Sequence, residues 1–114
     1  MHELSICQNA LSQIEKLAHQ HAANAVCRVH VQIGPLSGVD ADLLANAFPI
    51  AIAGSVADGA ELVVETLPLR VHCSKCGSDS EVRPNHLACP SCGNWQTSLI
   101  SGHEIILSSI ELEK

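Results

Sequence analysis

The sequence predicts an α+β (mixed α/β) fold, with two helices packed on one face of a small three-stranded sheet and a cysteine-rich lobe inserted between two strands. Three observations predict it. Two segments of the 114-residue chain carry apolar residues at helical spacing, and three more read as strands. Four cysteines lie between the second and third of these strands. A sheet with one polar face needs helices on its other face, so both helices are expected on the same side.

The first two elements are predicted by apolar periodicity. Residues 3–22 form an amphipathic helix in this interpretation. Its apolar residues at helical spacing are Leu4, Cys7, Leu11, Ile14 and Ala18. Residues 26–33 alternate between an apolar face and a polar face, which is typical of a half-buried strand that ends before Pro35. Cys7 on the apolar stripe is interpreted as an inert buried thiol, and Cys27 at the strand start is given no function.

The next three elements follow in order. Residues 40–53 carry a second apolar stripe, and Pro49 inside it cannot donate to the carbonyl of Ala45, which predicts a kink or a short break. Residues 60–69 form a strand in one of two registers, with either Leu62 and Val64 or Val63 and Leu67 facing the core. Residues 102–113 form the last strand.

The four cysteines form two identical brackets, each a Cys-x-x-Cys pair followed by glycine, and they predict a zinc-ribbon-like lobe with a four-cysteine site over residues 70–97. The cysteines are Cys73, Cys76, Cys89 and Cys92. Four thiolates fill the tetrahedral shell of Zn(II), so the expected site is structural and not catalytic. The remaining residues, 1–69 plus 98–114, form the helix–sheet domain. A redox role for the pairs and a mixed site using His72 or His86 are the alternatives.

The first residues also have metal-binding character. The amine of Met1, the amide of His2 and the His2 imidazole are able to close fused chelate rings on one metal ion. The first amides of a helix lack an intrahelical acceptor, so a metal can deprotonate them without breaking a helical hydrogen bond. A planar nitrogen set suits Ni(II) or Cu(II), whereas Glu3 is as easily an acidic residue favoured at a helix start.

Composition excludes several other classes of protein. The net charge of −6 and the absence of tyrosine disfavour a zinc ribbon that binds nucleic acid or a transcription component, which is the alternative function. The histidines show no catalytic zinc motif and no nucleophile–base pattern is visible, so the chain is not expected to be an enzyme. No leader is visible and the longest uncharged stretch is too short to span a bilayer. A cytoplasmic protein with reduced thiols is expected.

The whole chain resembles the hydrogenase maturation nickel metallochaperone family, HypA and its paralogue HybF. The matching segments are MHELS at 1–5, IGPLSGV at 33–39, DGAEL at 58–62, both cysteine brackets, and SGHE at 101–104 with SIE at 109–111. Pro49 is a departure from the family pattern, which usually has an acidic residue after a phenylalanine there.

The resemblance implies a function and a set of site residues. It implies that His2 and Glu3 bind Ni(II), that the four bracket cysteines bind Zn(II), and that Asp40 lies in the nickel region, although an acid there is more commonly a helix N-cap. It implies work with the accessory GTPase HypB and delivery of nickel to the large subunit of a [NiFe] hydrogenase, with urease served in some organisms.

Overall fold

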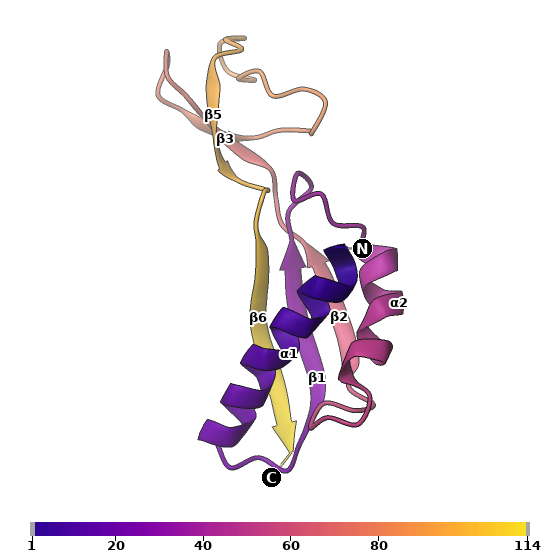
Figure 1. Cartoon of the computed structure of the whole chain (residues 1–114). Helices are drawn as coiled ribbons and strands as arrows, with labels where there is room; N and C mark the ends of the chain where they lie inside the picture. Colours follow the sequence, from indigo (N-terminus) through magenta and orange to yellow (C-terminus); the bar gives the residue numbers. More distant parts are fainter. Residues whose placement is uncertain (1, 114) are drawn as a thin grey trace. The chain divides into compact units, whose positions relative to one another are not determined.

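The computed structural model describes residues 2–113, and for His2 it describes the backbone alone. The described residues form two helices and two three-stranded sheets, whose elements Figure 1 shows in chain order. The elements in chain order are α1 (His2–Gln20), β1 (Ala25–Ile33), α2 (Ala41–Ile52), β2 (Glu61–Thr66), β3 (Arg70–Cys73), β4 (Asp79–Glu81), β5 (Thr97–Ser101) and β6 (Ile105–Glu113). Neither helix is long and apolar enough to cross a membrane.

The chain divides into two compact units. The first contains the residues up to Val31, Val39–Glu65 and the residues from Ile106 on, and the second contains Gln32–Gly38 and Thr66–Ile105. The second unit is therefore larger than the lobe predicted at 70–97. Backbone hydrogen bonds outside the cysteine segment extend this unit. The amide of Leu36 donates to the carbonyl of Gly102, and the amide of Leu67 donates to the carbonyl of Ile33.

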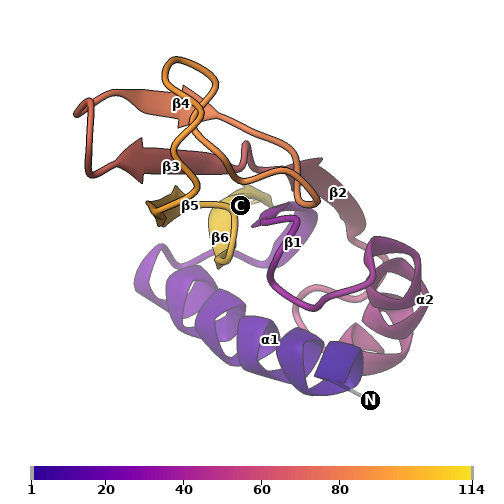
Figure 2. The ribbon, with the colours of Figure 1, turned by 90° about the horizontal axis from the view of Figure 1, so that it is seen from above.

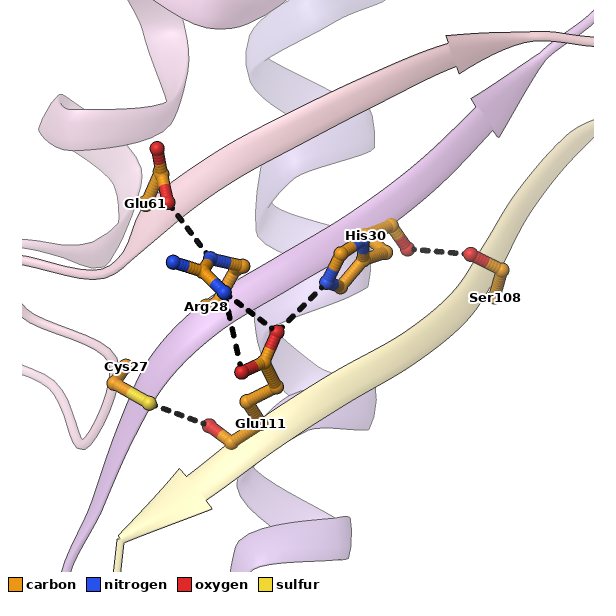
Figure 3. A network of polar contacts seen from close by, with 6 residues as sticks. All are labelled: Cys27, Arg28, His30, Glu61, Ser108 and Glu111. Carbon is orange, nitrogen blue, oxygen red and sulfur yellow. Dashed lines mark hydrogen bonds and ion pairs between the residues drawn. The ribbon is translucent and has the colours of Figure 1, made fainter.

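The first unit is built on the sheet β2-β1-β6. In Figure 3 the arrows of β1 and β2 run the same way and that of β6 runs the opposite way. The chain thus passes from β1 through α2 to the parallel strand β2, which requires a crossover of this kind. Figure 2 shows both helices on one side of the sheet, as the sequence predicts.

The core of the first unit is aliphatic, with one aromatic ring. Its buried side chains from the helices are Cys7, Ile14 and Ala18 of α1 and Leu44, Phe48 and Ile52 of α2. Strand β1 adds Val26, Val29 and Val31. The Cys7 thiol lies 3.8 Å from the carbonyl oxygen of Leu44, and burial, followed by the charge of Glu3, raises its pKa. Cys7 is therefore a buried thiol, as predicted.

Helix α2 runs without interruption through Pro49, so a break there is wrong, whereas the alternative, a kink, stays a prediction. Pro49 and Ala45 are both exposed, so the Ala45 carbonyl that loses its helical donor lies at the surface of the unit. Solvent can satisfy that carbonyl there, which lowers the cost of an interior proline. The helix begins after Asp40, whose Oδ1 accepts the amides of Asp42 (2.9 Å) and Leu43 (3.2 Å).

The second unit is built on the antiparallel sheet β4-β3-β5, with a register shift between Arg70 and Val71 on the β5 side. These short strands are absent from the sequence prediction. Gly34 approaches the turn after β5 so closely that a Cβ at Gly34 would lie 2.2 Å from the carbonyl carbon of Gly102. Gly102 itself has φ +111°, a conformation that other residues rarely adopt.

Candidate metal centre

The two cysteine brackets form turns of matching geometry. The amide of Gly77 donates to the carbonyl of Cys73 (3.0 Å), and the amide of Gly93 donates to that of Cys89 (2.8 Å). Gly77 and Gly93 have φ +76° and +79°, which a glycine adopts without steric cost. The glycine after each bracket therefore allows the backbone conformation that closes the turn.

The turns bring all four predicted cysteines together. Their ligand atoms lie within 4.8 Å of one another, with Cys73 and Cys92 separated by 3.5 Å and Cys76 and Cys89 by 3.6 Å. Metal–sulfur bonds of about 2.3 Å in a tetrahedron place the sulfurs about 3.8 Å apart. The sulfurs are thus too far apart for disulfides and at the separation that one tetrahedral ion needs.

Backbone amides favour the thiolate form in both brackets. The amide of Cys76 donates to the Cys73 sulfur at 3.4 Å, and this contact, aided by the amide of Lys75, lowers the pKa of Cys73 to about 6. The amide of Cys92 likewise lowers the pKa of Cys89. Thiolates are the metal-binding form of cysteine, so the fold prepares these two buried sulfurs for a cation.

Four thiolates close together are electrostatically unfavourable, and the pKa of the exposed Cys92 thiol shows this. The amide of Asn94 acts to lower its pKa, but hydrogen bonding with the neighbouring sulfurs of Cys73, Cys76 and Cys89, together with burial, raises it to about 11. A divalent cation removes this conflict by neutralising the negative charge that accumulates on the sulfurs.

Two polar side chains that the sequence prediction missed lie next to the sulfurs. The Ser78 hydroxyl is 2.8 Å from the Cys76 sulfur, and the Asn94 amide nitrogen is 3.7 Å from that of Cys73. Both follow directly after the bracket glycines, Gly77 and Gly93. A polar residue directly after a bracket glycine can therefore be predicted to contact the sulfurs, because the chain turns back toward them at that position.

The two histidines near the brackets do not join the sulfur group. Among the described residues, the metal-binding group consists of the four cysteines, without His72 or His86. His72 instead places Nδ1 2.7 Å from Oδ1 of Asp79 across the β3–β4 ladder. The site therefore presents four sulfur ligands and resembles a closed structural shell more than an open catalytic one.

The second predicted site falls partly outside what the structure describes. Met1 and the side chain of His2 lie outside the described residues. Glu3 is described, and its carboxylate is buried, with 7% of the residue exposed. Its Oε2 accepts the backbone amide of Asp40 at 3.4 Å, so Glu3 joins the start of α1 to the N-cap of α2. The amides of Glu3 itself and of Asp40 lower the pKa of Glu3.

The face of the first sheet away from the helices carries a polar cluster that the sequence prediction also missed (Figure 3). Arg28 of β1 bridges Glu61 of β2 (2.7 Å) and Glu111 of β6 (3.1 Å), and Nε2 of His30 lies 2.9 Å from the same Glu111 carboxylate. Cys27, which the sequence left without a role, donates to the carbonyl of Glu111 at 3.4 Å. These contacts pair neighbouring strands across the exposed face.

The fold and the sulfur group together define a small metal-binding protein with a structural four-cysteine centre, and comparison with known proteins defines its family. Residues 1–112 match the family model HypA, described as hydrogenase/urease nickel incorporation, metallochaperone. The chain belongs to this family of nickel metallochaperones for hydrogenase maturation, as the resemblance predicted. The curated relatives that the chain matches are named hydrogenase maturation factors.

The relatives match over nearly their whole length. Hydrogenase maturation factor HypA of Nitrosospira multiformis is 46% identical over 98% of this chain and 97% of its own. The HypA protein of Aquifex aeolicus is 44% identical over 99% and 98%. A solution structure of the nickel metallochaperone HypA from Helicobacter pylori superimposes with a TM-score of 0.74 at 25% identity, covering 97% of each chain. The similarity therefore includes both units.

Proposed function

We propose that the protein binds Ni(II) at its N-terminus through His2 and Glu3 and delivers it to the large subunit of a [NiFe] hydrogenase, working with a HypB-type GTPase. The observation that carries this proposal is the match of residues 1–112 to a nickel-incorporation family. The four cysteines bind Zn(II) in this proposal, and the zinc ion keeps the second unit folded. The nucleic-acid-binding alternative has no support, because the matched proteins are maturation factors.

The position of Glu3 supports a nickel site of modest affinity. Amide hydrogen bonds lower the pKa of its carboxylate, which favours the ionised, metal-binding form. Glu3 also lies at the first turn of α1, where backbone amides have no helical acceptor. A site at a chain terminus has few fixed ligands and stays accessible to a receiving protein. A dissociation constant in the micromolar range, about −8 kcal/mol, permits such a handover.

The zinc assignment follows from the donor set. Four sulfurs at tetrahedral separation, two of them with a lowered pKa, match the preference of Zn(II) for thiolates. The bound ion supplies charge neutralisation and cross-links the turns. Residues of this chain then orient the ligands, since Asn94 and Ser78 contact the sulfurs.

Replacement of the host's own gene tests the function. In a strain that carries His2→Ala, the nickel content of the purified hydrogenase large subunit is expected to fall to the level of the gene deletion. High nickel in the medium is expected to restore part of it. Gln8→Ala, an exposed change elsewhere on α1, is the matched control.

Full nickel loading in the His2→Ala strain at low external nickel contradicts the proposal. Urease from the same extracts, where the host makes it, shows whether the role extends to that enzyme.

A further inference from the structure

The second unit has a hollow of about 400 Å³ that the sulfur group does not use. The segment from the end of β4 into the second cysteine bracket forms it. The residues that line it are Glu81, Val82, Arg83, Asn85, His86, Ala88 and Pro90. One part of this lining is apolar, and the other carries three side chains that donate hydrogen bonds.

Arg83 and His86 are held side by side by the backbone. They pair in an isolated antiparallel bridge, and the amide of His86 donates to the carbonyl of Arg83 at 3.0 Å. Residues directly opposite each other in such a pair place their side chains on the same face, with Cβ atoms about 4.5–5.5 Å apart. Pro84 between them limits the turn to few conformations.

The donors that line the hollow are free to bind a ligand. Within residues 2–113, the side chains of Arg83, Asn85 and His86 make no hydrogen bond and no ion pair, including with the nearby Glu81. A guanidinium offers a planar fork of N–H groups that matches a carboxylate. Arg83 therefore presents a complete fork, with an imidazole beside it and an amide one residue away.

We propose that this hollow binds a carboxylate carried on an apolar stem, namely a single Asp or Glu side chain of a partner protein, flanked by uncharged residues. The wall of Val82, Ala88 and Pro90 suits the methylene groups of such a side chain. A single arginine next to Glu81, in a chain of net charge −6, suits a monoanion better than a phosphate dianion. The inference is independent of nickel binding, because every residue it uses belongs to the second unit.

A titration followed by backbone amide NMR tests the proposal on the zinc-loaded full-length protein. The probe is a blocked pentapeptide with a central Glu flanked by Val and Ala, and its partner probe has Gln in place of Glu. The Glu peptide is expected to shift the amides of Asn85, His86 and Ala88 and to saturate. The Gln peptide is expected to bind roughly tenfold more weakly, because it loses a charge-assisted pair.

Variants assign the effect to the guanidinium. Arg83→Gln is expected to weaken binding of the Glu peptide roughly tenfold. Arg83→Lys is expected to recover only part of that affinity, because lysine lacks the fork of N–H groups. Arg70→Gln is the matched control, since Arg70 is exposed on β3 of the same unit and lies outside the hollow. Equal binding of both peptides, unchanged binding by Arg83→Gln, or tighter binding of inorganic phosphate than of the Glu peptide overturns the proposal. Bound zinc is measured in every variant, so a loss of fold is recognised separately.

Discussion

The carboxylate of Glu3 accepts the backbone amide of Asp40 across 3.4 Å, and this contact joins residues 37 positions apart. Asp40 in turn caps α2 through its own carboxylate. Both acidic side chains thus have structural partners in the first unit. The nickel proposal assigns Glu3 a second role, and the two roles have different experimental signatures.

Glu3→Gln is expected to lower the melting temperature of the first unit at neutral pH, because a neutral amide is a weaker acceptor for the Asp40 amide. The pKa of Glu3 is lowered from its ordinary value of 4.5 by amide hydrogen bonds in the folded state. Its stabilising effect is therefore complete above the unfolded-state pKa and is lost as the pH falls through the folded-state pKa.

The measurement is far-UV circular dichroism during heating, with wild type and Glu3→Gln compared from neutral to acidic pH. The difference in melting temperature is expected to stay constant at neutral pH and to shrink below about pH 4.5. A difference that grows in acid contradicts the assigned contact. Glu15→Gln, on the exposed side of α1, provides the control for loss of one carboxylate on the same helix.

Asp40→Ala is expected to destabilise the first unit by about 1 kcal/mol, because the amides of Asp42 and Leu43 lose their acceptor. Asp40→Asn keeps a capping oxygen and is expected to stay within a few tenths of a kcal/mol of wild type. Urea unfolding curves measure both differences. Equal losses in the two variants indicate that the charge of Asp40, and not its capping geometry, stabilises the unit.

Gly34→Ala is expected to destabilise the second unit by about 1–3 kcal/mol, because the new methyl group would overlap the backbone of Gly102. Gly38→Ala is the informative comparison, because no atom lies within 4 Å of a Cβ at Gly38, although its φ of +79° still strains an alanine. Amide hydrogen exchange in β3 and β5 measures the effect. A larger loss of protection in Gly38→Ala than in Gly34→Ala contradicts the assigned contact.

Removal of metal by a strong chelator is expected to unfold the second unit and to leave the helices and their sheet intact. The sulfur-bound ion is expected to supply most of the folding free energy of a unit whose core is small, since buried side chains there are few. Trp95 is the single tryptophan and the chain has no tyrosine, so its fluorescence reports on this unit alone. Trp95 is 76% exposed in the folded state.

Fluorescence and circular dichroism are therefore expected to respond differently to the chelator. The Trp95 emission and the amide protection of β3 change, while the helical signal at 222 nm persists. Cys73→Ser is expected to reproduce this behaviour without chelator, and Cys27→Ser, which changes an exposed thiol of the first unit, is not. Loss of the helical signal together with the fluorescence change contradicts the independence of the two units.

The part of the fold that the sequence predicts consists of segments long enough to show a regular apolar period. Both helices and the three strands of the first sheet were identified within a few residues, because burial on one face imposes a period on the sequence. Strands β3, β4 and β5 were missed, because segments such as Asp79–Glu81 are too short and polar to show a period. Their pairing depends on neighbouring strands that lie apart in the sequence.

The candidate sites divide in the same way. The cysteine brackets can be recognised from the sequence, because two cysteines separated by two residues in a turn direct both sulfurs at one centre. The contact of Glu3 with Asp40 and the bridge from Arg28 to Glu111 depend on tertiary packing and strand register, which the sequence pattern does not contain. Arg83 beside His86 was equally invisible before the turn between them was known.

Nickel binding at the N-terminus is tested by isothermal titration of Ni(II) into the untagged, zinc-loaded protein, with His2→Ala and a chain extended by one residue before Met1 as comparisons. We expect micromolar binding by wild type, at about −8 kcal/mol, and roughly tenfold weaker binding by both comparison proteins. One bound zinc ion per chain is expected in all three. Equal nickel affinity in the three proteins would contradict nickel binding at the N-terminus, because His2 and the terminal amine would then lie outside the site.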